Sequence, residues 1–150
     1  MSYDKPQYTA RHVIGPIFAT FAAAIYTVDT YVKTNAGKQD RIEFFRKVKI
    51  TGFRATTRSG GKSGDDLAGH LTRRICLQYP TTVTTAATKV ATCVIGTAAG
   101  LTTSGAVVAA NAEIPADQQL RLTLWITGDG TASSMNAMSA DCYIEYQDRN

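Results

Sequence analysis

The chain has 150 residues, of which 44% are hydrophobic and 19% charged, and its formal net charge at pH 7 is +4. This length suffices for one domain with its own hydrophobic core. The lysines and arginines are scattered rather than gathered with aromatics on one stripe, which argues against a nucleic-acid-binding module. No apolar run approaches the roughly 20 residues of a membrane helix, and the N-terminus lacks a signal-peptide pattern. We therefore expect a soluble protein made in a reducing cytosol, with no membrane partner.

Residues 1–12 are polar and without periodicity, and they are expected to form a flexible N-terminal arm ahead of a single domain at residues 13–150. The first part of that domain is ambiguous. Apolar residues within 14–33 recur at spacings of three and four, which is a helical stripe. The same stretch is rich in β-branched and aromatic residues, which favour strands. We expect extended structure there, and one helix remains the alternative.

The middle of the chain contains several predicted strands. Residues 47–54 form the first, with Gly52 at a bulge or a close backbone approach. A long polar loop at 57–70 follows, and then an alternating strand at 71–79 in which only Arg73 breaks the apolar face. Residues 89–95 are apolar on both faces, which predicts a strand covered on both sides. Residues 106–110 predict a short strand.

The clearest signal is the alternation of residues 120–126. Leu120, Leu122, Leu124 and Ile126 fall on one side, and polar residues and Trp125 fall on the other. Residues 115–118 supply a tight turn before it, and residues 128–139 predict a turn and a polar loop after it. A last strand at 140–147 alternates in the same way; if it pairs with 120–126, Arg121 faces Glu145. The fold class predicted is all-β, an antiparallel β-sandwich or jelly-roll-like barrel.

The sequence shows no convergent set of catalytic residues. Gly60-Gly61-Lys62-Ser63 lacks the first glycine of a phosphate-binding loop, because Thr56 stands at that position. Asp65, Asp66 and His70 are too sparse for a transition-metal site, and Asp129 lacks the other acids of a calcium loop. We therefore predict no catalytic, cofactor-binding or metal-binding residues and no small-molecule substrate, and we do not expect an enzyme.

Cys76, Cys93 and Cys142 each lie in a predicted strand, and none has a second cysteine at metal-ligand spacing. A free cysteine packs as a small hydrophobe. We therefore expect all three to be buried thiols.

Trp125, Tyr143 and Arg121 are the candidate protein-interface residues. All three fall on the polar side of strongly alternating strands, and an exposed aromatic there indicates either a protein interface or a cover provided by the same chain. Both interpretations stay open at this point.

The Thr/Ala/Gly-rich β-chain, the turn at 114–117 leading into Leu-Arg-Leu-Thr-Leu, and the terminal Tyr-Ile-Glu-Tyr at 143–146 resemble small virion proteins of tailed bacteriophages. Among these the chain is most similar to capsid decoration (cement) proteins. The resemblance implies a β-sandwich that binds the major capsid protein or other virion subunits, stabilises the phage head and forms a homo-oligomer, in particular a trimer. It also implies a location in the virion. The alternatives are a carbohydrate- or ligand-binding β-sandwich, with Trp125 or loop acids as its contacts, and another virion subunit such as a jelly-roll capsid or tail-tube protein.

Overall fold

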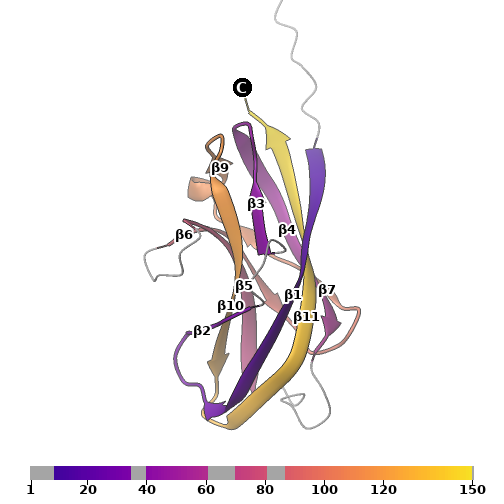
Figure 1. Ribbon diagram of the computed structural model, residues 1–150, viewed down its shortest axis with the longest axis vertical. Coiled ribbons are helices and arrows are strands. Elements are labelled where there is room, and N and C mark those ends of the chain that lie inside the picture. The colour runs from indigo at the N-terminus through magenta and orange to yellow at the C-terminus, as the bar shows by residue number, and fades with distance from the viewer. Residues whose placement is uncertain (1–8, 35–39, 61–69, 81–86, 150) are drawn as a thin grey trace, which may run out of the picture.

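The computed structural model describes residues 9–34, 40–60, 70–80 and 87–149, without the side chains of residues 22–23 and 136–137. The strands are β1 (Thr9–Ile25), β2 (Thr30–Val32), β3 (Arg41–Glu43), β4 (Val48–Ser59), β5 (Leu71–Tyr79), β6 (Thr88–Ile95), β7 (Thr102–Ser104), β8 (Ala106–Val107), β9 (Glu113–Ile114), β10 (Gln119–Gly128) and β11 (Ala132–Asp148), with a 3-10 turn, η2 (Ala109–Asn111), before β9. The fold is all-β, as predicted (Figure 1).

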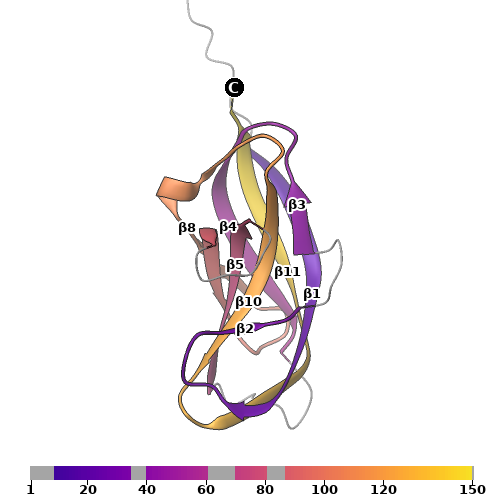
Figure 2. The same ribbon diagram turned by 60° about the vertical axis from the view of Figure 1, so that its left-hand side comes forward.

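Two antiparallel sheets pack face to face as an elongated sandwich (Figures 1 and 2). One sheet has the order β1-β11-β4-β7 with β9 beside β4, and the other has β2-β10-β5-β6-β8 with β3 beside β10. The pairings are nested: β1 pairs with β11, β2 with β10, β4 with β7 and β5 with β6. A double-sheet arrangement with this nesting is a jelly roll. The fold is therefore the predicted antiparallel β-sandwich, with the strand order of a jelly roll.

The alternation of residues 120–126 places its aliphatic side chains in the core. Leu120, Leu122, Leu124 and Ile126 are fully buried, where β10 runs between β5 and the short strands β2 and β3. The strand predicted at 71–79 is β5, with the same bounds. Arg73 keeps the inward direction of its strand and is buried as well. The period of two thus fixed the inner face of both strands correctly.

Several boundaries differ from the sequence predictions, because strand pairing overrides local composition. Residues 9–12 are not part of an arm but pair with β11 as the start of β1; residues 1–8 lie outside the described part of the chain. The contested stretch 14–33 is extended, mostly in β1 and β2. Residues 57–59 belong to β4 rather than to the predicted loop, of which residues 61–69 are not described.

The polar loop predicted up to residue 139 is instead the first half of β11, which begins at Ala132. Met135 and Met138 are fully buried there and pair with β1. The β1–β11 register contains three shifts, between Ile14 and Ile17, between Ala19 and Phe21 and between Phe21 and Ala24. Each shift disturbs the alternation of side chains, so the period of two that identifies a strand is lost from the sequence in this region.

One predicted contact is wrong for a topological reason, and one predicted burial pattern holds only in part. The strand β11 belongs to the sheet opposite β10, so Arg121 does not face Glu145. The strand β6 is covered on both faces over only part of its length, because the adjacent Val90 and Ala91 are both buried whereas Val94 is exposed. Sequence alternation gives the faces of a strand but not its neighbours.

The turn before β10 is formed as predicted. The amide of Gln118 donates to the carbonyl of Pro115 (3.4 Å), and the amide of Asp117 donates to the carbonyl of Phe44 (2.8 Å). Asp117 has φ 62°, in the left-handed region that aspartate tolerates better than most residues. Gly52 lies next to a register shift in the β4–β11 ladder, as its interpretation as a bulge requires. Within the described residues, no helix is long and apolar enough to cross a membrane.

Candidate interaction surfaces

Trp125 is covered by its own chain. Its side chain is only 8% exposed, and its ring lies 5.8 Å from that of Tyr31 on β2, with the ammonium of Lys89 on β6 5.5 Å from its centroid. Its indole N–H donates to the hydroxyl of Thr123 (3.1 Å), which in turn donates to the amide oxygen of Gln78 (3.0 Å). Of the two interpretations that the sequence left open for Trp125, the structure therefore shows the cover provided by the same chain.

Arg121 is held by a buried carboxylate. Its Nε donates to Oδ2 of Asp40 at 3.1 Å, and its terminal nitrogen donates to the hydroxyl of Tyr31 at 3.3 Å. The side chain of Arg121 is 15% exposed and that of Asp40 1%. The pair therefore ties the segment before β3 to the outer face of β10, and a role in binding a partner remains a prediction.

Tyr143 lies on the outer face of the opposite sheet, within a row of charged residues. The guanidinium of Arg54 lies 5.5 Å from the centroid of the Tyr143 ring, and Glu145 is within 3.2 Å of Arg11 and 3.9 Å of Arg54. Gly52 leaves room for this carboxylate, because a Cβ there would lie 2.9 Å from its oxygen. Tyr143 is half-buried. A partner that bound Tyr143, as predicted, would therefore contact the surrounding charged side chains as well as part of its ring.

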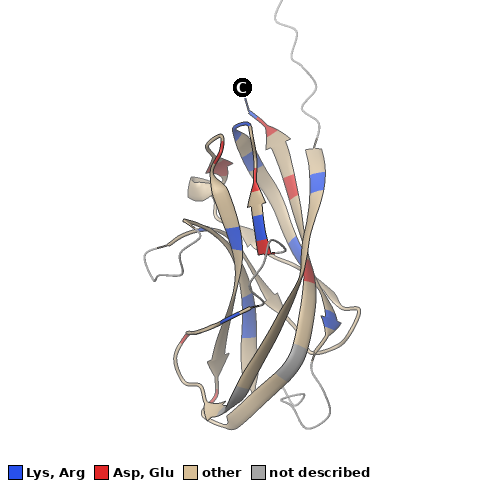
Figure 3. Ribbon diagram, in the orientation of Figure 1, with Lys and Arg blue, Asp and Glu red and all other residues tan. Residues whose placement is uncertain are grey.

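A mainly apolar surface follows β1 and the turn after it. Val13 (55%), Phe18 (46%), Ile25 (64%) and Val28 (69%) are the exposed large hydrophobics of this segment, called here the β1 band. In Figure 3 the lower halves of β1 and β11 carry no Lys, Arg, Asp or Glu among the described residues. Natural sheet edges are usually blunted by charge, and β1 lies at the edge of its sheet. The unbroken uncharged run at 13–28 is the sequence signal that would have identified this band.

A second surface lies at the N-terminal end of β1, beyond Val13. A hollow of about 300 Å³, called here the Phe45 hollow, lies between the β3–β4 turn and the ends of β1 and β11. It is lined by His12, Ile42, Glu43, Phe44, Phe45, Arg46, Val48, Tyr146 and Asp148. Phe45 itself is 83% exposed, whereas its neighbour Phe44 is buried. The Phe-Phe pair alone gave no sign of which ring would face outward.

Of the residues considered for metal or phosphate chemistry, His70, Asp129 and Gly60 have close contacts within the chain. His70 Nδ1 lies 2.9 Å from a carboxylate oxygen of Asp129, and the hydrogen bond from His70, with that from the amide of Thr131, lowers the pKa of Asp129 to about 2. Asp65 and Asp66 lie outside the described residues. Gly60 is required by packing, since a Cβ there would lie 1.8 Å from the carbonyl oxygen of Thr97. Among the described side chains, no group of three or more His, Cys, Asp or Glu could hold a metal ion.

All three cysteines are buried and unpaired, as predicted. Burial raises the pKa of each thiol, most strongly for Cys142 between β1 and β4. The thiolate is the reactive form of cysteine, so these side chains behave as core hydrophobes.

No protein-family model and no curated protein matches the sequence. Among solved structures, the chain is similar to one described as "Structure of infectious bursal disease virus Gx strain", with 13% sequence identity and a TM-score of 0.41. The match covers 93% of this chain and 33% of that chain, so this chain spans about a third of its length. A likeness at this identity and TM-score is too low to assign a function.

Proposed function

We propose that the chain is a structural subunit of a virion, which binds neighbouring subunits through its outer surface and turns over no substrate. The observation that carries the proposal is the β1 band, an uncharged and partly exposed apolar strip on the edge strand of a jelly roll. Large hydrophobic side chains that stay exposed along an edge strand indicate a protein–protein contact. In its finer form, the proposal is a decoration or cement protein that stabilises a phage head, as the sequence resemblance implies.

The interior of the sandwich is filled by side chains, so a partner would bind on the outer surface of the molecule. The space between the sheets is filled by fully buried aliphatic side chains such as Ile75, Leu122 and Ile144. Jelly rolls also serve as lectins and as cupins, so the fold alone does not select a function. The β1 band favours a protein partner over a sugar or another polar ligand, because a polar ligand has no hydrogen-bonding partner on aliphatic side chains.

A lattice needs only modest affinity at each contact. Several weak contacts repeated over neighbouring subunits give tight net attachment, because each later contact forms at a high effective concentration. We propose that residues 1–8, which precede β1, add contact area on binding. A truncation that tests them should begin at Thr9, because residues 9–12 pair with β11 and their removal would shorten the sheet.

The test is attachment to the native particle. We expect the purified chain to cosediment with particles and to be visible on them by electron microscopy. Val28→Ser, in the β1 band, should weaken cosedimentation, whereas Val94→Ser, an exposed valine on β6, should not. Both variants should keep the melting temperature of the wild type within a few degrees. If the wild-type chain failed to bind particles, or if both variants bound as well as the wild type, the proposal would be wrong.

A further inference from the structure

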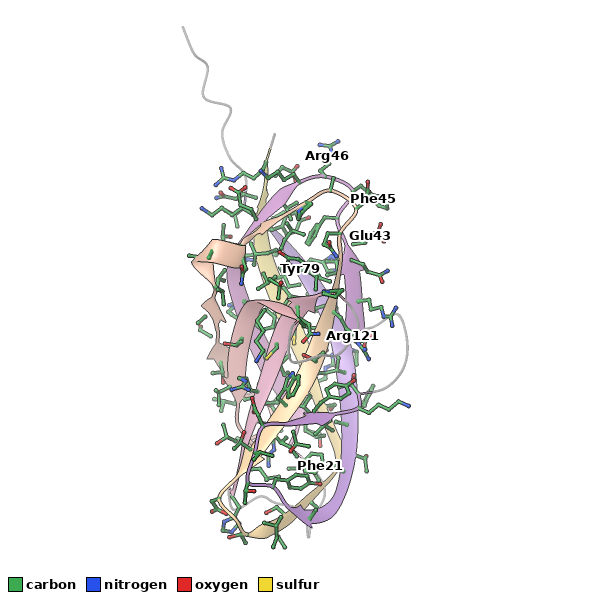
Figure 4. The ribbon with its side chains drawn as sticks, turned by 90° about the vertical axis from the view of Figure 1, so that its left-hand side faces the viewer. Phe21, Glu43, Phe45, Arg46, Tyr79 and Arg121 are labelled. Atoms are coloured by element: carbon green, nitrogen blue, oxygen red, sulfur yellow. The ribbon has the colours of Figure 1, made fainter. Side chains whose placement is uncertain are left out.

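The Phe45 hollow combines a protruding aromatic ring with a recess beside it. Figure 4 shows Glu43, Phe45 and Arg46 together at one end of the molecule, around the turn that follows β3. The side chain of Phe45 is 83% exposed, so most of its apolar surface is in contact with water. Leaving a side chain of this size in water is unfavourable. The recess next to it is about 300 Å³, at the lower end of the range for pockets that bury a ligand group.

The floor of the recess suits an aromatic guest. The rings of Phe44 and Tyr146 lie 4.6 Å apart with an interplanar angle of 58°, and Val48 completes an apolar base. Aromatic rings prefer tilted or edge-to-face neighbours at such distances over stacking face to face. A third ring entering the recess would therefore find both apolar surface and aromatic edges.

The rim of the recess carries charges of both signs. Glu43 is exposed on one side, and Arg46 lies 3.8 Å from Asp148 with both side chains mostly in solvent. A pair so exposed contributes little to stability, so Arg46 can turn to another carboxylate at small cost. A partner that fits this rim should present an aromatic ring together with one basic and one acidic side chain.

This chain presents that same set of groups on the same surface. We propose that two copies dock about a two-fold axis, so that Phe45 of each copy enters the Phe45 hollow of the other and Arg46 of each pairs with Glu43 of the other. A two-fold contact requires a patch that is complementary to itself, which a ring beside a recess and opposite charges beside each other provide. The contact lies at the His12 end of β1, whereas Ile25 and Val28 of the β1 band lie at and beyond its other end, and it does not depend on whether the chain belongs to a virion.

The first experiment measures self-association of the full chain by sedimentation equilibrium. We expect a reversible dimer for the wild type. Phe45→Ser should raise the dimer dissociation constant about 100-fold, because the symmetric contact loses two anchors worth roughly tenfold each. Val94→Ser, which removes an exposed hydrophobic side chain elsewhere, should leave it unchanged. Thermal melts should show that both variants remain folded.

The second experiment exchanges the charges. Arg46→Glu and Glu43→Arg should each weaken the dimer, because each places like charges across the axis. An equimolar mixture of these two variants should associate more tightly than either alone, since each heterologous contact then pairs opposite charges. The double variant Glu43→Arg/Arg46→Glu should recover the affinity of the wild type.

The results that would overturn the inference are distinct from those that bear on particle binding. A wild-type chain that remains monomeric, a Phe45→Ser chain that dimerises as the wild type does, or a mixture of the charge variants that does not associate would each rule out the docking. Dimerisation of the isolated chain with no attachment to particles would instead support the docking and contradict the virion proposal.

Discussion

Replacing Arg121 by alanine should destabilise the protein much more than its position on the polar face of β10 would suggest. The guanidinium of Arg121 donates a 3.1 Å hydrogen bond to Asp40, whose side chain is 1% exposed. The nearest other cation, Arg41, lies 4.0 Å from the second carboxylate oxygen, and that oxygen accepts no hydrogen bond within the described part of the chain. The variant would therefore leave a buried carboxylate with one distant cation, whose side chain is 45% exposed.

The expected magnitude follows from what is lost. A hydrogen bond to a charged group contributes about 1.5–3 kcal/mol, and breaking a buried ion pair costs about 3–5 kcal/mol because the remaining charge is uncompensated. Arg121 is partly solvated and Arg41 compensates in part, so we expect a loss of about 2–4 kcal/mol in the free energy of unfolding. At this chain length the melting temperature should fall by roughly 4–16 °C.

Urea denaturation of four proteins measures the effect: the wild type, Arg121→Ala, Asp40→Ala and the double variant. Because the two residues are in contact, the double variant should be more stable than the sum of the single losses predicts, with a coupling energy of about 1–3 kcal/mol. A loss below about 0.5 kcal/mol for Arg121→Ala, typical of an unpaired surface residue, would refute the reasoning. So would a coupling energy near zero.

Three further predictions concern the core, the thiols and one surface pair. Leu122→Ala should lower the free energy of unfolding by about 2–5 kcal/mol in urea melts, because the side chain is fully buried between the sheets; a loss below 1 kcal/mol would contradict the inner face assigned to β10. The three cysteines should react slowly with a thiol reagent in the native protein, Cys142 most slowly of all. Rapid labelling of the native protein would contradict their burial. The pKa of Asp129 is lowered from 3.8 to about 2, so its contribution to stability is complete above the higher value and disappears as the pH falls through the lower one. Asp129→Asn should therefore flatten the pH dependence of the melting temperature in that window, and an unchanged slope would show that the hydrogen bonds from His70 and Thr131 do not lower this pKa in solution.

The candidate surfaces were only partly accessible to sequence reasoning. The polar side of β10 was identified correctly, but the side chains there are covered by Tyr31 and Lys89, which come from distant parts of the chain. The β1 band was present in the sequence as an uncharged run, yet an apolar run alone does not distinguish an exposed edge from a buried strand. Phe45 could not be told from Phe44, because which of two adjacent rings faces outward depends on where the turn begins.

The sequence by itself determined the fold class and the faces of the regular strands. The alternation at 71–79 and 120–126 is a local property, since successive side chains of a strand point to opposite sides whatever the partners are. Only the tertiary structure decided which strands are neighbours, because pairing depends on the register of segments far apart in the chain. It therefore placed Glu145 with Arg11 and Arg54, and Arg121 with Asp40. The strands β1 and β11, the longest pair, were not fully identified from the sequence for the same reason. Their pairing contains register shifts, so it depends on contacts across the sheet and not on a regular local pattern.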